Sequence, residues 1–415
     1  MMNIISGGKK MKKIKNTPNL NRRNFLAGTA SIAGLAATAS VVPITFANAN
    51  HTDGSKGLPD FINWKNRDAL IVHSDKGIET HRSAIGEGLI TPNANVYIRN
   101  NMPTMSDAQI GDRNNWKVSF EGVNSPKSFT LAELKAMGTT TIATVLQCSG
   151  NGRGFFEHGP SGSQWQTGAA ACVFWTGIPV KTLVDACGGI SSGANFMTSA
   201  GVDHEPTGLA PKDAMVERSV PKKVYEDALL AWDMNGVPLP NSHGGPLRMI
   251  TPGYFGINNV KHLGKVAFTA DESQVKFMKS SYRISPIGKK GSEYPTCWEM
   301  PVKSWITRPT DETGTVKAGK VQIVGVALGG TRKVKSVKVS VDGGNKWQKA
   351  KFIGPDLGKF AWRQFVLETT LSAGTYNIAS LASNGKDKQP ELRMENRRGY
   401  AHNGWKDHSV NITVA

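Results

Sequence analysis

The stretch Thr141–Gly154, TIATVLQCSGNGRG, joins a run of β-branched residues to a loop that contains three glycines. The run Thr141–Gln147 predicts a strand, so Cys148 stands where that strand would end. The glycines that follow let the backbone approach a bulky ligand closely and direct N–H groups toward it. Arg153 adds a permanent positive charge close to the thiol. The stretch therefore predicts a site built around Cys148 at the end of a strand.

Three interpretations of this loop compete. The simplest is a buried structural cysteine beside a turn. A phosphatase-type nucleophile needs five residues between the cysteine and the arginine, whereas four separate Cys148 from Arg153, and Gly154 and Pro160 disfavour the helix that should follow. The third is a thiolate ligand to a soft or redox-active metal. The loop alone leaves the first and third interpretations open.

The loop lies in a region that mixes strands and helices. Trp116–Val123 alternates like a strand, and Val180–Ala186 indicates a short helix that a glycine pair ends. Thr130–Met137 opens with a capping residue and has a glutamate three places later, which predicts a helix N-terminus. Residues 96–305 are therefore expected to form a mixed α/β domain, and the polar residues 50–95 an irregular segment that wraps around it.

The chain changes character after about residue 300. Valines alternate with polar residues over Val337–Val341, and Asp342–Gly344 supplies a hairpin turn. Similar runs without a helical stretch between them predict an immunoglobulin-like antiparallel β-sandwich over 306–415, with its boundary in Pro309–Gly319. These runs are Val321–Val326, Phe360–Leu367, Tyr376–Ala382 and Val410–Val414. The expected fold class is α+β.

The N-terminal segment has the order of an export signal. Arg22–Arg23 precede a mild apolar stretch at Ala27–Val42, and Ala47–Ala49 supplies small residues at a cleavage site. The paired arginines are similar to the twin-arginine signal, whose translocase carries folded proteins. We expect residues 1–49 to be removed after Ala49 and the mature protein to reach the periplasm. No second apolar run of about 20 residues follows, so we expect no membrane anchor.

Composition bounds the class of protein. The chain has 415 residues, of which 39% are hydrophobic and 20% charged, which suits two folded domains rather than a disordered chain. The net charge is +18, and removing the seven cations of residues 1–49, which hold no acid, leaves about +11. Such a field attracts small anions or an acidic partner, and we expect no nucleic-acid partner. Whether the chain starts at Met1 or Met11 stays open.

The cysteines give little support to other metal sites. Cys148, Cys172, Cys187 and Cys297 are too few for a disulfide scaffold. No Cys-x-x-Cys pair or His-x-x-x-His spacing supports zinc or an iron–sulfur cluster, and no Cys-x-x-Cys-His motif supports covalent haem. We expect the three cysteines other than Cys148 to be buried apolar thiols.

The cysteine loop also resembles a known family. Leu146-Gln147-Cys148-Ser149-Gly150-Asn151-x-Arg153 is similar to the molybdenum-ligand motif of the sulfite oxidase family of molybdopterin enzymes. Further motifs in the same order extend the resemblance over nearly the whole mature chain, and together they indicate the family far better than any single one. They are Val96–Asn100 with Pro103, Trp165–Gly168, Leu230–Pro240, His243–Arg248, Asn259–Gly264, Tyr282–Pro286, Val341–Trp347 and Ala361–Arg363.

The resemblance implies a reaction and the residues that catalyse it. Cys148 and a single pterin dithiolene would hold an oxo-molybdenum centre that oxidises sulfite to sulfate. Arg99, Arg153 and Arg363 would bind the substrate dianion, for which the planar, permanently charged fork of arginine is suited. Tyr282 would form a hydrogen bond near the metal oxygen and couple proton to electron movement.

The resemblance also implies a cofactor set, namely molybdenum and molybdopterin. The pterin and its phosphate would be held by Asn100, Cys148, His243, Arg248, Asn259 and Lys261. Trp165 follows in a motif downstream of the cysteine, where lining of the substrate pocket and plain core packing stay equally open.

Departures from the family pattern shape the expectation. No cytochrome b-type haem domain is apparent, so we expect no haem in this chain and direct electron transfer to a separate c-type cytochrome. Gly159–Gln164 occupies a stretch where the family often carries a lysine, and Asn258 and His262 replace an arginine and a tryptophan that are common in the animal enzymes. The family implies that the sandwich domain mediates a homodimer.

These observations predict a periplasmic, haem-free molybdenum sulfite dehydrogenase. One alternative is the molybdenum subunit of a thiosulfate-oxidising complex, which acts on carrier-bound sulfur. A periplasmic methionine sulfoxide reductase fits less well, because the arginine set suits a small oxyanion. A non-catalytic oxyanion-binding relative is a third alternative. The sequence leaves open the electron acceptor and the choice between free sulfite and carrier-bound sulfur.

Overall fold

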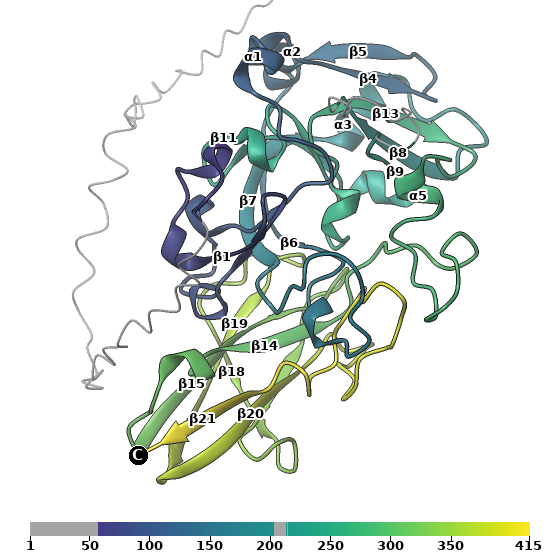
Figure 1. Cartoon of the computed structure of the whole chain (residues 1–415). Helices are drawn as coiled ribbons and strands as arrows, with labels where there is room; N and C mark the ends of the chain where they lie inside the picture. Colours follow the sequence, from purple (N-terminus) through teal and green to yellow (C-terminus); the bar gives the residue numbers. More distant parts are fainter. Residues whose placement is uncertain (1–56, 203–212, 214) are drawn as a thin grey trace, which may run out of the picture. The chain divides into compact units, whose positions relative to one another are not determined.

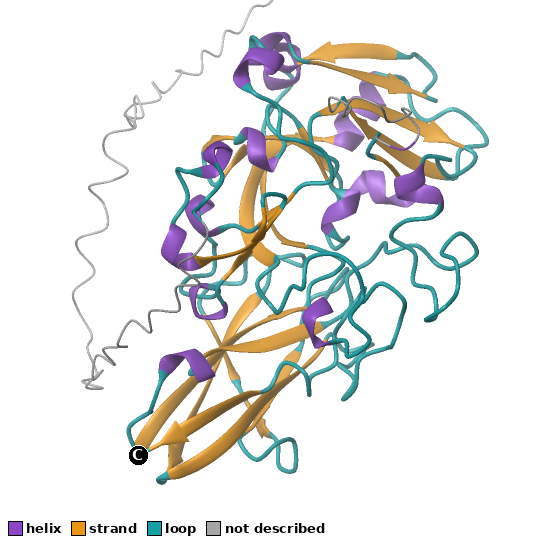
Figure 2. Ribbon diagram, in the orientation of Figure 1, coloured by secondary structure: helices purple, strands orange, loops and turns teal. Residues whose placement is uncertain are grey.

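The computed structural model describes residues 57–202, 213 and 215–415, which belong to one compact unit (Figure 1). The export signal expected at 1–49, its cleavage after Ala49 and the first residues of the expected wrapping segment lie outside the described residues. Short helices are mixed with strands, as the sequence predicts, and Figure 2 shows that strands and loops prevail.

The irregular wrapping segment expected at 50–95 is instead partly a small sheet. β1 (Leu70–Ser74) and β2 (Gly77–Thr80) form an antiparallel hairpin, and β3 (Ile98–Arg99) pairs with β2. The sheet has a small core of its own, which consists of Ile62, Leu70, Val72, Ile78 and Ile98. The prediction is wrong here because Leu70–Val72 is only a short apolar run, and strand pairing is what joins it to Ile78 and Ile98.

Two five-stranded sheets form the region between residues 117 and 269. The strand predicted at Thr141–Gln147 is confirmed as β6 (Thr140–Gln147), and the one predicted at Trp116–Val123 as β4 (Lys117–Glu121). The first sheet has the order β11 (Val237–Pro238), β10 (Leu229–Met234), β7 (Ala170–Pro179) and β6, with β12 (Arg248–Ile250) paired to β10. The second has the order β5 (Lys127–Thr130), β4, β13 (Leu263–Thr269), β8 (Phe196–Gly201) and β9 (Glu217–Pro221).

The helices are short and follow their local signals. α2 (Leu131–Ala136) begins at the predicted capping box, in which the Thr130 and Glu133 side chains accept hydrogen bonds from each other's backbone N–H groups. α3 (Val180–Ala186) has the predicted bounds. The remaining described α-helices are α1 (Asp107–Ile110) and α5 (Lys276–Lys279), and several 3-10 turns lie between the strands. None of the helices in the described part has the length and apolar character that a membrane crossing requires.

The C-terminal region forms two four-stranded antiparallel sheets whose apolar faces share one buried core. The first has the order β14 (Lys303–Arg308), β15 (Gly319–Leu328), β19 (Arg363–Leu371) and β18 (Lys351–Ile353). The second has the order β17 (Gln348–Lys349), β16 (Ser336–Ser340), β20 (Gly374–Ser383) and β21 (Val410–Val414). The predicted strands are present, and the immunoglobulin-like arrangement stays a prediction.

This β-rich region starts earlier than the sequence indicates. β14 begins at Lys303 and pairs with β15, so the sheet begins before the expected start at 306 and before the boundary expected in Pro309–Gly319. Lys303 and Ser304 are polar and yet fully buried. The strand therefore lacks the alternation of polar and apolar residues by which a half-buried strand is found in a sequence.

The strand that precedes Cys148 is packed against the C-terminal region. The Val145 N–H of β6 donates to the Phe360 carbonyl at 2.9 Å. Trp305 and Trp362 are fully buried in the same core as Val145 and meet edge to face, with 6.2 Å between their ring centroids. The position of Cys148 thus depends on packing between the two parts of the molecule.

We predict that Trp362→Ala lowers the free energy of unfolding by about 3–5 kcal/mol, because it removes a large buried side chain and leaves a cavity. Trp64→Ala is the control, since that ring is 45% exposed, and it should change stability by about 0.5 kcal/mol or less. Urea titration followed by circular dichroism measures both. Equal losses in the two variants would contradict the packing described.

Candidate active site

A cavity opens where β6 ends. Cys148 lines this cavity, and segments distant in sequence bring most of the predicted site residues to the same lining. These residues are Arg99, Asn100, His243, Arg248, Asn259, Lys261 and Tyr282. The structure does not bring Arg153, Trp165 or Arg363 to the lining.

The lining is strongly electropositive. Arg99, Arg248 and Lys261 contribute positive charges, and among the described residues no Asp or Glu lines the cavity. Burial and neighbouring cations lower the pKa of His243 well below its usual range and that of His262 to about 4. Both imidazoles are therefore neutral near pH 7. Several cations gathered in a partly closed cavity favour an anionic ligand.

The backbone of the loop after β6 fixes Cys148. The Cys148 N–H donates to the Ala169 carbonyl at 2.9 Å, and its carbonyl accepts from the Asn151 N–H at 3.0 Å. The Asn151 side chain donates to Gln147 at 3.1 Å and accepts from the Ala169 N–H at 3.1 Å. Gly152 has a φ of +102°, which a residue with a Cβ adopts only with strain. The thiol, 7% exposed, is thus held at a defined place in the wall.

The Asn101 side chain joins two of the predicted catalytic residues. Its Oδ1 accepts from the Arg99 guanidinium at 2.8 Å and from the Tyr282 hydroxyl at 2.9 Å. Tyr282 has a φ of +55°, a left-handed conformation that bulky residues rarely adopt. Its ring stacks on Tyr400 with 5.5 Å between centroids. The surrounding structure therefore holds a strained tyrosine with its hydroxyl beside Arg99.

Sequence analysis missed several of these supporting residues. Asn101 adjoins a family motif but has no signal of its own. Tyr400 lies 5.4 Å from the Arg153 guanidinium as well as against Tyr282. Arg218 is buried, places its guanidinium 5.7 Å from the Tyr282 ring and donates to Asn258 at 3.1 Å. No local pattern indicates these contacts, because their partners are far apart in the sequence.

Arg99 lies between the cavity and a second, more open hollow. Burial would lower its pKa, but Tyr282, Cys148, Tyr400 and Tyr97 outweigh burial and raise the pKa of Arg99. It therefore stays charged. The outer hollow, of about 860 Å³, shares Arg99, Asn100 and Asn101 with the cavity, and its other lining residues are His73, Ser74, Lys76, Gly162, Ser163 and Gln164. The stretch that departs from the family pattern thus contributes to the approach toward Arg99.

Lys261 and Arg248 connect the residues that the resemblance assigns to the pterin and its phosphate. Lys261 donates its Nζ to the Asn100 side chain and to a backbone carbonyl. Arg248 donates to the His243 carbonyl at 2.7 Å and to the Asn259 carbonyl at 3.1 Å. These bonds tie the segments around 100, 243 and 259 into one wall.

Two polar atoms of this wall have no partner. His243 Nε2 and the Ser149 hydroxyl are buried and form no hydrogen bond with any described residue. An unsatisfied buried polar atom is unfavourable unless a ligand satisfies it. Together with Arg248 and Lys261 they fit an anionic group that offers several hydrogen bonds, such as a pterin with its phosphate. Cys148 fits the role of a sulfur ligand to the metal that such a pterin carries.

Arg153 lies inside the loop rather than in the cavity wall. It is buried, and its Nε and Nη1 donate to the Arg398 and Ser163 carbonyls at 2.8 and 3.0 Å. Its Nη2 makes no hydrogen bond to a described residue. Three glycines make room for the side chain, since a Cβ on any of them would come within about 3.0 Å of it; they are Gly150, Gly162 and Gly399. The structure thus gives Arg153 a role in holding the loop.

Arg363 lies on the C-terminal sheet, away from the cavity lining. It begins β19, donates to the Gly354 carbonyl at 3.3 Å, and lies 3.8 Å from the Asp356 carboxylate. Its guanidinium also covers the Phe352 ring at 4.8 Å. This placement corrects the expectation that Arg363 binds the substrate, because its guanidinium already pairs with the Asp356 carboxylate.

Trp165 belongs to the hydrophobic core. It is fully buried, with its ring edge to face against His73 at 5.2 Å and Tyr97 at 6.4 Å. Tyr97 lines the cavity, whereas Trp165 does not. Of the two interpretations left open for Trp165, the structure supports packing behind the wall.

The remaining cysteines are free, buried thiols, as expected. Burial raises the pKa of Cys172 and of Cys297 to about 12 and also raises that of Cys187. Within the described ranges, no three His, Cys, Asp or Glu side chains converge as a metal site. Cys148 is therefore the sulfur that the cavity offers to a metal.

Two family models match consecutive parts of the chain. Residues 104–277 match the model of the oxidoreductase molybdopterin binding domain, and residues 294–415 match that of the Mo-co oxidoreductase dimerisation domain. The crystal structure of the sulfane dehydrogenase SoxCD from Paracoccus pantotrophus superposes with a TM-score of 0.68 at 24% identity, over 88% of this chain and 95% of that one. This likeness shows the fold.

Curated relatives share the sequence over most of its length. Human mitochondrial sulfite oxidase is 31% identical over 368 residues, which cover 84% of this chain and 66% of the human protein. The sulfite oxidase of Arabidopsis thaliana is 28% identical over 357 residues, 79% of this chain and 89% of the plant protein. The chain thus spans about two thirds of the human relative. The two consecutive domain matches and these relatives show that the chain belongs to the sulfite oxidase family of molybdopterin oxidoreductases.

Proposed function

We propose that the protein is a periplasmic molybdenum sulfite dehydrogenase. Sulfite and water are converted to sulfate and two protons, and two electrons pass singly to a c-type cytochrome. One observation carries the proposal: Cys148, Arg99 and Tyr282 line one electropositive cavity that, among the described residues, has no carboxylate. Such a cavity suits an anionic cofactor and a dianionic substrate together.

The family implies a molybdenum cofactor, and the wall has the groups to hold it. Cys148 would ligate the metal. His243, Arg248 and Lys261 would bind the pterin and its phosphate, with Asn100 and Asn259 fixing the segments on which these residues stand. When bound, the molybdenum centre supplies the oxygen-atom transfer and takes up the electrons.

We assign substrate binding to Arg99. It lines both the cavity and the outer hollow, where Lys76 adds a second cation. Its Nη2 is already held by Asn101, so the planar fork is oriented before sulfite arrives. Preorganised donors stabilise a developing oxyanion without reorganising during the reaction. Arg153 supports this arrangement from inside the loop rather than by direct contact.

We assign to Tyr282 the role of holding a proton next to the substrate. Its hydroxyl donates to Asn101 Oδ1, the same atom that accepts from Arg99. A proton held at the Tyr282 oxygen is therefore adjacent to the guanidinium that binds the anion. Turnover releases two protons, and this hydroxyl is the group we assign to pass them toward the outer hollow.

Features of the sequence support the proposed export, electron acceptor and assembly. The twin-arginine-like segment supports folding and cofactor insertion before transport to the periplasm. The lack of a haem motif in this sequence supports transfer to a separate c-type cytochrome. The match of residues 294–415 to a dimerisation domain supports a homodimer, through a C-terminal domain for which we propose an immunoglobulin-like sandwich.

We predict that Arg99→Met lowers kcat/KM for sulfite by about 10- to 150-fold, which corresponds to the loss of one charged hydrogen-bonding partner. Arg363→Met is the matched control, because Arg363 is paired with Asp356 outside the cavity lining, and it should change kcat/KM by less than about threefold. Steady-state reduction of cytochrome c measures both. A larger effect at Arg363 than at Arg99 would refute the assignment.

We predict stoichiometric molybdenum in the purified protein and loss of sulfite-dependent cytochrome reduction in Cys148→Ala, because no other cysteine lines the cavity. Cys187→Ala, at a buried thiol remote from the lining, should retain metal and activity. Elemental analysis and steady-state assays provide the readouts. Wild-type protein without molybdenum would favour a non-catalytic oxyanion-binding relative.

A second candidate substrate is sulfur bound to a carrier protein. The sulfane dehydrogenase whose fold this chain shares is named for sulfane sulfur, and the outer hollow at Arg99 is open enough to admit more than a free anion. We predict turnover of free sulfite by the protein alone, since Arg99 and Lys76 suffice to attract a dianion. Inactivity with free sulfite but turnover of carrier-bound sulfur would reverse this order.

A further inference from the structure

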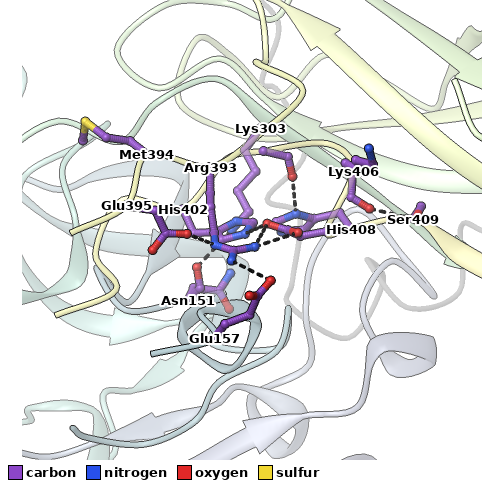
Figure 3. Close-up of polar contacts among 12 residues, drawn as sticks. Asn151, Glu157, Lys303, Arg393, Met394, Glu395, His402, Lys406, His408 and Ser409 are labelled. Carbon is purple, nitrogen blue, oxygen red and sulfur yellow. Dashed lines mark hydrogen bonds and ion pairs between the residues drawn. The ribbon is translucent and has the colours of Figure 1, made fainter. Parts of the chain in front are cut away.

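A polar cluster from the C-terminal region lies against the loop that follows Cys148. We call Lys303, Arg393, His402 and Asp407 the loop-facing cluster. Figure 3 shows Lys303, Arg393 and His402 beside Asn151 and Glu157 of that loop. None of the four lines the cavity or the outer hollow. The proposed function leaves their role unexplained.

Lys303 makes an unusual contact for a lysine. It is fully buried at the start of β14, and its Nζ donates to the Asn151 carbonyl at 3.1 Å. No acidic side chain in the described part forms an ion pair with it, and burial lowers its pKa to about 7. Burying an amine in this way is unfavourable, and an apolar side chain would fill the space at no such expense. The contact with the loop is what the amine adds.

The acceptor of this bond is the residue that closes the turn on Cys148. The Asn151 N–H donates to the Cys148 carbonyl at 3.0 Å, and the Asn151 side chain bridges Gln147 and Ala169. With Lys303 on its carbonyl, every polar group of Asn151 is bonded to protein. The orientation of the Cys148 peptide therefore depends on a contact from β14.

His402 holds the next residue of the loop. Its ring packs so closely on Gly152 that a Cβ there would lie 2.6 Å from the ring. Hydrogen bonds from His402 and Arg393 outweigh burial and lower the pKa of Asp407, so its carboxylate is ionised and only accepts. The His402 Nε2 therefore carries the proton that is donated to Asp407 at 2.8 Å. The ring orientation is fixed by this bond.

Arg393 completes the cluster and reaches the far end of the loop. It donates to both Asp407 oxygens at 2.9 Å. The same guanidinium lies 5.1 Å from the Phe156 ring and 3.7 Å from the Glu157 carboxylate. Contacts from one cluster thus touch the loop at residues 151, 152, 156 and 157, on both sides of Arg153.

We propose that the loop-facing cluster is a positioning device for Cys148. Lys303 fixes the turn through Asn151, and His402, oriented by Asp407 and Arg393, fixes it through Gly152. The C-terminal domain thereby sets how the thiol is presented to the cavity without contributing a residue to the cavity wall. The inference rests on the proposed function in taking Cys148 as the metal ligand.

The first test uses protein expressed without cofactor, so its readout does not require catalysis. Lys303→Met removes the amine and keeps the length of the side chain. We expect iodoacetamide to alkylate Cys148, identified by peptide mass spectrometry, about tenfold faster than in wild type, because the turn loses its hydrogen bond from Lys303. Lys406→Met is the control, since that side chain is 59% exposed, and its rate should match wild type. A wild-type rate in folded Lys303→Met overturns the proposal.

The second test uses the loaded enzyme. Lys303→Met should shift the visible absorption of the sulfur–molybdenum bond, compared per molybdenum atom, and lower kcat about tenfold with KM for sulfite within about twofold. Ile378→Ala serves as a variant destabilised elsewhere, because Ile378 is fully buried in the core between the two C-terminal sheets, and it should leave the spectrum unchanged. An unaltered spectrum and kcat in Lys303→Met, or a spectral shift of equal size in Ile378→Ala, overturns the positioning role.

Asp407→Asn keeps the inference testable if Lys303→Met does not fold. It retains the shape of the side chain and removes the charge that orients His402, so it should accelerate Cys148 alkylation severalfold; a wild-type rate overturns the proposal. The two proposals fail separately. Wild-type protein that lacks molybdenum contradicts the proposed function. If the wild-type enzyme binds molybdenum and is active, but the variants are alkylated at the wild-type rate, only the positioning role is contradicted.

Discussion

Positive charge gathered in a partly closed cavity is the constraint on which this structure depends. Arg99, Arg248 and Lys261 line one wall, the two histidines beside them are neutral, and within the described ranges no carboxylate joins the lining. Charges in such surroundings interact more strongly than in water. The site is therefore completed by anions, and the family supplies one in its cofactor.

The residues that line the cavity and the residues that hold them in place come from different parts of the chain. Segments before residue 285 provide the cavity wall, including the sulfur of Cys148 and the strained Tyr282. The C-terminal region supports them from outside the wall: the Arg398 carbonyl binds Arg153, Tyr400 stacks on Tyr282, and Lys303 binds the cysteine turn. This division explains why large buried tryptophans lie where β6 meets the C-terminal sheets, since movement there would reach the thiol.

Much of the fold could be predicted because it is encoded locally. The capping box of α2, the bounds of α3 and the strand before Cys148 depend on residues within one or two turns of each other. The exceptions are informative. β1 and β2 were not predicted because their apolar residues become a core only after pairing, and β14 was not predicted because its polar residues are buried by partners more than 70 residues away.

The sequence by itself determined which chemical groups the site would contain: a thiol at a strand end, a glycine-rich turn, and a set of cations in the family order. Only the tertiary structure decided which of them meet. It placed Arg99 in the wall, Arg153 inside the loop and Arg363 on an ion pair of its own. A motif fixes residue types through local backbone geometry, whereas the direction of a long charged side chain is set by the carbonyls, glycines and counter-ions that packing brings to it from distant segments.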